Sequence, residues 1–133
     1  MEEISVHDNF LAGYEVHCEE HWIRIRTEFR DRGEPFEFTE VFFSEVVAYD
    51  FKQDLFGSII FDIEEIPLEL LLKKCQAAFD EGRRYGWPRF WEGSLEGARQ
   101  HLESQGIHAF QLQSSYGMDG WVLAKEMKFI RKD

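Results

Sequence analysis

Residues 36–63 read FEFTEVFFSEVVAYDFKQDLFGSIIFDI, and this stretch decides the fold class. It holds three runs rich in β-branched and aromatic residues, at 36–43, 45–51 and 58–63, and such runs favour strands over helices. The residues Asp54-Leu55-Phe56-Gly57 predict a turn before the third run. The stretch therefore predicts consecutive antiparallel strands.

The segments before this stretch also have strand character. Residues 14–18 alternate apolar and polar side chains, and residues 22–29 divide into an apolar face and a polar face. The polar residues between them make a hairpin plausible, and residues 31–35 predict a turn because they contain a glycine and a proline. The first half of the chain is thus expected to form an antiparallel meander.

After residue 66 the apolar residues take the spacing of an α-helix. Pro67 suits the first turn of a helix that ends near Gly82, and Ser94 suits the N-cap of a second helix that ends near Gln105. The apolar residues of the first helix are Leu68, Leu71, Leu72, Cys75 and Phe79. Strand character returns at 107–113 and 120–130.

These patterns predict one α+β domain that spans residues 1–133. We expect a mainly antiparallel sheet of about six to seven strands, with two helices inserted before the last two strands. Because strands do not alternate with helices along the chain, a doubly wound α/β fold is not expected.

Composition limits the function. The chain has 133 residues with 26 Asp and Glu against 15 Lys and Arg, a net charge of −11, which argues against a nucleic-acid partner. No secretion signal opens the sequence, and no apolar run approaches the roughly 20 residues that span a bilayer. We therefore expect a cytoplasmic protein without a membrane partner. Free, buried thiols are expected at Cys18 and Cys75, although a disulfide between them stays possible.

The negative charge is concentrated in the first part of the chain. Residues 1–81 carry 20 acidic and 7 basic side chains, and residues 82–133 carry 6 and 8. If strands 45–51 and 58–63 pair through the turn at 54–57, Asp50 and Asp62 lie on one solvent face. The candidate acidic contact is Asp50, Asp62, Glu64 and Glu65. Such a face either keeps the protein in solution or recognises a basic protein partner.

The segment Tyr85-Gly86-Trp87-Pro88-Arg89-Phe90-Trp91 is a loop rich in aromatic residues between the two helices. Tryptophan, tyrosine and arginine are enriched at binding hot spots, so Trp87 and Trp91 are candidate aromatic anchors. The alternative is that both rings fold inward and complete the core.

Catalytic patterns are weak. His7, His17 and His21, with neighbouring carboxylates, contain ligand types of divalent metals, so a metal-dependent hydrolase is an alternative function. The spacing of His17 and His21 matches a helical ligand pair, but their segment is expected to be strand and turn. Because the sequence has no phosphate loop and no nucleophile elbow, it favours a binding protein without a cofactor over an enzyme. An oligomeric scaffold, such as a homodimer, is a further alternative.

Two segments carry a resemblance to a known class of proteins. They are His7-Asp8-Asn9 with Gly13-Tyr14, and Val46 to Phe51 leading to Phe61-Asp62-Ile63-Glu64-Glu65. Through them the first half of the chain loosely resembles the small acidic immunity proteins that bacteria encode beside secreted toxins. The resemblance implies a non-enzymatic inhibitor that blocks a basic toxin by protein–protein contact, since opposite fields speed association.

Overall fold

The computed structural model of the protein describes residues 5–31, 33–53 and 56–132. Its elements in chain order are β1 (Phe10–His17), β2 (Trp22–Phe29), β3 (Glu37–Lys52), β4 (Ile59–Ile66), α1 (Leu68–Gly82), the short 3-10 turn η1 (Arg83–Tyr85), α2 (Leu95–Ser104), β5 (His108–Tyr116) and β6 (Asp119–Lys132).

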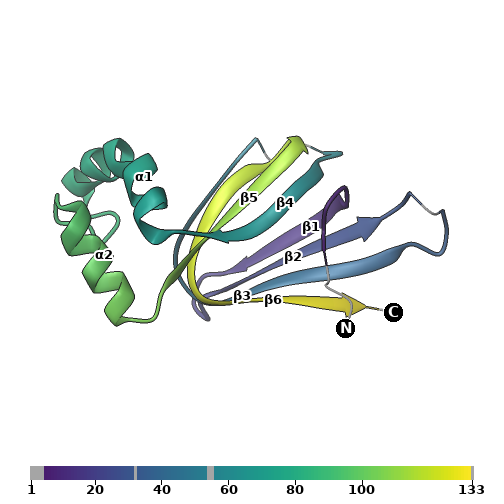
Figure 1. Ribbon diagram of the computed structural model, residues 1–133, viewed down its shortest axis with the longest axis horizontal. Coiled ribbons are helices and arrows are strands. Elements are labelled where there is room, and N and C mark those ends of the chain that lie inside the picture. Colours follow the sequence, from purple (N-terminus) through teal and green to yellow (C-terminus); the bar gives the residue numbers. More distant parts are fainter. Residues whose placement is uncertain (1–4, 32, 54–55, 133) are drawn as a thin grey trace.

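The six strands form one antiparallel sheet that closes into a barrel in the order β1-β2-β3-β6-β5-β4 (Figure 1). The α+β class and the mainly antiparallel sheet are therefore confirmed. The closure of the sheet into a barrel was not expected from the sequence, and neither was the 3-10 turn between the helices. The seam of the barrel is short: β1 and β4 form one ladder pair, at Phe10 and Ile59, and three backbone hydrogen bonds join residues 8–11 to residues 58–60.

Two details of the expected strand order were wrong. The runs at 36–43 and 45–51 belong to one strand of 16 residues, β3, whose register shifts between Val46 and Ala48. In addition, β3 does not pair with β4: it pairs with β2 along its first half and with β6 along nearly its whole length. Both edges of β3 are thus hydrogen-bonded to neighbouring strands, so the meander of β1, β2 and β3 does not continue to β4. Of the turn expected at 54–57, Asp54 and Leu55 lie outside the described residues.

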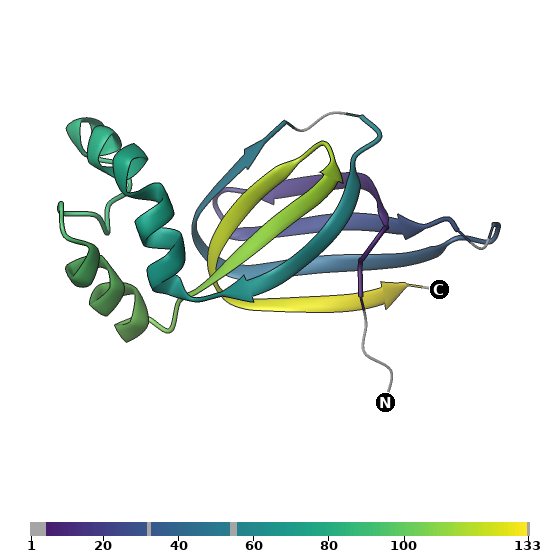
Figure 2. The ribbon, with the colours of Figure 1, turned by 45° about the horizontal axis from the view of Figure 1, so that its top comes forward.

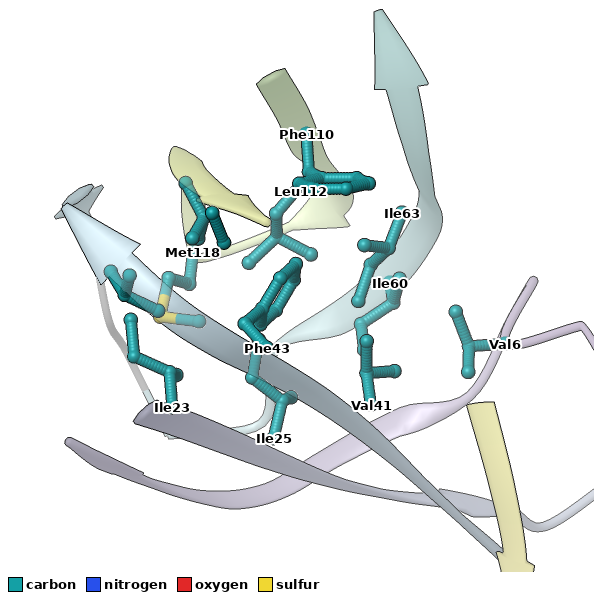
Figure 3. Close-up of a cluster of buried hydrophobic side chains, with 13 residues drawn as sticks. Val6, Ile23, Ile25, Val41, Phe43, Ile60, Ile63, Phe110, Leu112 and Met118 are labelled. Carbon is teal, nitrogen blue, oxygen red and sulfur yellow. The ribbon is translucent and has the colours of Figure 1, made fainter. Parts of the chain in front are cut away.

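The barrel encloses the first hydrophobic core. Phe43 of β3 lies at its centre and packs against Phe110 of β5, with ring centroids 5.6 Å apart (Figure 3). Val6, which precedes β1, is fully buried in the same cluster. Figure 3 labels Val6, Ile23, Ile25, Val41, Phe43, Ile60, Ile63, Phe110, Leu112 and Met118 of this core.

A second core lies between the helices and the outer face of the sheet. Phe79 of α1 is fully buried, and it meets the rings of Trp91 and Trp121 at centroid distances of 5.6 and 5.8 Å. Ala48 and Leu123 contribute from the strands. This cluster holds α1 and α2 against one end of the barrel, as two views of the ribbon show (Figures 1 and 2).

The helix limits follow the expected local signals. Pro67 directly precedes α1, and Ser94 caps α2 by accepting a hydrogen bond from the Gly97 N–H at 3.1 Å. No helix within the described ranges combines the length and the apolar composition that a membrane crossing requires. Both cysteines are free. Cys75 is partly buried, but Cys18 is exposed, so the expected burial of Cys18 was wrong.

Candidate binding site: an acidic face and a groove

The register of four strands places one row of polar side chains on the outside of the barrel. Asp50 of β3 lies opposite Trp121 of β6, Trp121 lies opposite Gln111 of β5, and Gln111 lies opposite Glu64 of β4. Side chains at paired positions point to the same face of a sheet. Asp50 and Glu64 therefore share the outer face, at opposite ends of the row.

Asp62 belongs to a neighbouring row on this face. It lies opposite Gln113, two residues beyond Gln111 on β5. Asp50 and Asp62 thus share a solvent face, as expected, but β5 and β6 separate their strands, whereas the sequence predicted direct pairing. Three strand spacings of about 4.8 Å place β3 and β4 about 14 Å apart.

Glu65 does not belong to the outer face. It lies opposite Phe110, whose ring is in the barrel core, so its side chain starts from the other face of β4. At the barrel end its carboxylate lies 3.0 Å from Nδ1 of His108. The expected cluster of four carboxylates is therefore incomplete, because Glu65 is separate.

The remaining carboxylates differ in their partners. Asp50 lies 3.7 Å from the Lys52 ammonium group, and Asp62 accepts a hydrogen bond from the Ile63 N–H at 2.8 Å. Among the described residues, neither Asp62 nor Glu64 forms an ion pair. We call these two residues the β4 acidic face.

On the other side of the barrel, two acidic side chains are paired with basic side chains of neighbouring strands. Glu15 of β1 lies 3.9 Å from both Arg24 and Arg26 of β2. Glu40 of β3 lies 3.4 Å from Arg24 and 3.9 Å from Lys132 of β6. Glu15 and Glu40 are thus paired with basic side chains of neighbouring strands, while the β4 acidic face keeps its charge.

Electrostatics at Glu15 agree with this contrast. The pKa of Glu15 is lowered from its ordinary value, chiefly by the hydrogen bond to the His17 ring at 3.3 Å and further by Arg26 and Arg24. The carboxylate form of Glu15 is therefore favoured by its neighbours within the chain.

A groove of about 650 Å³ lies beside the acidic face, between α1 and the outer face of the sheet. One turn of α1 provides Leu71, Lys74 and Cys75 as a wall, and Phe61 of β4 also lines the groove with 49% of its surface exposed. The other lining residues come from β3, β5 and β6: Asp50, Lys52, Gln111, Leu112, Gln113, Ser114, Ser115, Asp119, Gly120 and Trp121.

Several polar groups in the groove have no partner among the described residues. The side-chain amides of Gln111 and Gln113 form no hydrogen bond to the described residues, and neither does the indole N–H of Trp121. By contrast, the indoles of Trp22 and Trp91 donate to carboxylates at 2.9 and 2.7 Å. Lys74 likewise forms no ion pair with a described residue.

Other groups in the groove are already engaged. Asp119 accepts the backbone N–H of Ser114 at 2.8 Å, and the Ser114 hydroxyl donates to the Met118 carbonyl. Burial raises the pKa of the Cys75 thiol from its ordinary value, so the unreactive thiol form is favoured. Ser114 and Cys75 are therefore poor candidates for nucleophiles.

The two tryptophans of the aromatic loop have different environments. Trp91 is 98% buried in the second core, and its indole donates to Asp80, so the expectation that it anchors a partner at the surface was wrong. Packing the Trp91 ring against Phe79 in the core removes more apolar area from water than a surface position would, so burial is favoured. Trp87 keeps 44% of its surface exposed, although its ring meets the edge of Phe79.

The three histidines considered as metal ligands do not come together. Nδ1 of His7 lies 2.6 Å from a backbone carbonyl of β4, and Nδ1 of His21 lies 3.2 Å from a carbonyl of β3. The His17 ring stacks on Trp22 at 3.7 Å. Within the part of the chain that the structure describes, no three His, Cys, Asp or Glu side chains gather as a metal site. The alternative metal site was therefore wrong for these residues.

The groove was not expected from the sequence. The alternation of apolar and polar residues in Phe110-Gln111-Leu112-Gln113 could have indicated two side-chain amides on the solvent-exposed face of a strand. Their position beside Asp50 and Trp121 depends on which strands are neighbours, and no local pattern states that.

No protein-family model, curated protein or solved structure matches this chain.

Proposed function

We propose that the protein is a non-enzymatic binding protein that docks a cationic protein surface on the β4 acidic face. The observation that carries this proposal is the unpaired state of Asp62 and Glu64. Their two carboxylates lie on one exposed face and form no ion pair with a described residue, whereas Glu15 and Glu40 are neutralised by arginine and lysine.

Energetics support a recognition role. Asp62 and Glu64 lie two residues apart on the same face of β4, and like charges at such a distance repel each other and cost some stability. A basic partner relieves this repulsion and is drawn in by the field, which raises the association rate and makes it sensitive to salt. Asp50, at the far end of the same face, is paired with Lys52 at 3.7 Å and does not belong to the β4 acidic face.

The surroundings of the acidic face suit a protein partner. Phe61 precedes Asp62 and lies half exposed, so apolar area adjoins the charges as it does at many interfaces. A basic toxin of the kind that immunity proteins neutralise is a partner with this chemistry, and the resemblance of the first half of the chain supports that choice.

Titration of the 15N-labelled chain with a lysine decapeptide tests the proposal. We expect amide shifts concentrated at Asp62 and Glu64. The double variant Asp62→Asn/Glu64→Gln should bind about fivefold more weakly, as the loss of two exposed charge pairs of about 0.5 kcal/mol each implies.

A matched control removes the same charge elsewhere. Glu19 and Glu37 are exposed and form no ion pair with a described residue, so Glu19→Gln/Glu37→Gln changes the net charge equally. The control should bind the peptide like the parent chain. Equal weakening in both double variants would mean that only the total charge matters, and the acidic face would lose its role.

A homodimer is a second candidate. The observation that favours it is the short seam: between β1 and β4 the structure records a single ladder pair, at Phe10 and Ile59. A strand edge without a full ladder can pair with the same edge of a second copy.

A further inference from the structure

The groove between α1 and the outer face of the sheet differs from the acidic face in its chemistry. Among the residues that the structure describes, the charged ones that line it are Asp50, Asp119, Lys52 and Lys74, so the two signs balance. Asp50 is paired with Lys52, and Asp119 is bonded to the chain. Neither a strongly cationic nor a strongly anionic ligand gains net attraction there.

The free groups in the groove suit a ligand that both donates and accepts hydrogen bonds. Each glutamine amide offers an acceptor oxygen and two donor hydrogens, and the Trp121 indole adds a donor. Gln111 and Gln113 are two residues apart on β5, which separates their side chains by about 7 Å along the strand. Two hydroxyl groups of one sugar residue, or of two linked residues, span such a distance.

Apolar surface completes the match. Trp121 is partly exposed in the groove, and Phe61 lies at the β4 side. Aromatic rings of this kind pack well against the C–H face of a pyranose ring, while the indole N–H stays available for a hydroxyl.

Size favours a compact ligand over an extended peptide. A volume of about 650 Å³ falls within the range of small-ligand sites. The wall contributed by α1 is a single helical turn, from Leu71 to Cys75, so it is too short to accompany a long segment of chain.

From these observations we infer that the groove is a binding site for a neutral mono- or disaccharide, held by Gln111, Gln113 and Trp121. This inference goes beyond the proposed function and does not depend on it, because the residues that carry it are not those of the β4 acidic face.

The test is a titration of the 15N-labelled full chain with glucose, galactose, N-acetylglucosamine, maltose, lactose and chitobiose. We expect at least one of them to shift the side-chain amide signals of Gln111 and Gln113 together with the indole signal of Trp121. The same sugar should slow alkylation of Cys75, which lines the groove, and leave alkylation of the exposed Cys18 unchanged.

Two variants test the contacts. Gln111→Ala/Gln113→Ala should weaken sugar binding about tenfold, the change expected for two lost neutral hydrogen bonds. Trp121→Phe should also weaken sugar binding, because this change removes the indole N–H while it keeps an aromatic ring. The matched control Gln76→Ala/Gln105→Ala removes two exposed amides outside the groove and should bind like the parent.

Three results would overturn the inference: no shift at the groove with any of the six sugars, equal weakening in the control, or groove signals that respond to adenosine monophosphate but to no sugar. The outcome is separable from that of the proposed function, since Gln111→Ala/Gln113→Ala should leave binding of the lysine decapeptide unchanged.

Discussion

At the scale of single residues, Gly120 determines how closely β3 and β6 approach beside the groove. A Cβ at this position would lie 2.2 Å from the Asp50 carbonyl oxygen and 2.6 Å from the Phe51 ring. The obstacle is backbone, so it cannot move aside like a flexible side chain. Glycine here allows Asp50 and Trp121 to take opposite positions in the ladder.

We therefore expect Gly120→Ala to lower the free energy of unfolding by about 2–3 kcal/mol, because overpacking forces the strands apart. Urea denaturation measures this loss. Gly13→Ala is the control, since its Cβ would meet only the Arg26 guanidinium at 3.4 Å. A similar loss in both variants would mean that the penalty is general to glycines in strands rather than specific to this contact.

At the scale of elements, the N-terminal cap is the main local interaction that stabilises α2. Its narrow buried stripe consists of Ala98 and Leu102, so packing alone holds the helix less firmly than α1. Ser94 compensates by accepting the Gly97 N–H, and Arg99 links Glu96 and Glu103 on the exposed side. Because such exposed pairs contribute little, the cap is the stronger local term.

Replacing Ser94 with alanine should lower the free energy of unfolding by about 1 kcal/mol, whereas Ser94→Gly should lower it by only a few tenths, since glycine is tolerated at an N-cap. Thermal and urea unfolding of the two variants give the comparison. If alanine proved no worse than glycine, the hydroxyl would not be acting as a cap.

At the scale of the whole molecule, the barrel is unevenly joined. β3 and β6 pair over 13 positions, while β1 and β4 pair at one. The side of the barrel that contains the seam also contains the start of the β4 acidic face. The seam is therefore the weakest junction of the sheet, and it is the edge that a second copy could use.

Amide hydrogen exchange of the monomer should be slowest in β3 and β6 and fastest among the strands in residues 13–17 of β1, because local opening requires the fewest contacts there. Mass spectrometry at two protein concentrations separates the alternatives. Protection of residues 13–17 that increases with concentration would support the homodimer, and protection there equal to that of β3 in a monomer would contradict the weak seam.

Much of the local structure could be predicted from the sequence. The period-two pattern at 22–29 became β2, the helical spacing after Pro67 became α1, and Ser94 became the N-cap of α2. Each of these outcomes depends on residues within a few positions of one another, so the local chemistry is sufficient. The burial of Trp91 could not be read in this way, because its neighbour Phe79 lies on another element.

By itself, the sequence determined the α+β class, the helix limits, and the concentration of acidic residues before position 82. Only the tertiary structure decided that β6 rather than β4 lies beside β3, that Asp50 and Asp62 share a face across two intervening strands, and that Gln111 and Trp121 line a groove under α1. The physical reason is that side-chain alternation sets which face a residue takes, whereas strand order is set by competition among distant segments for the same hydrogen-bonding edge.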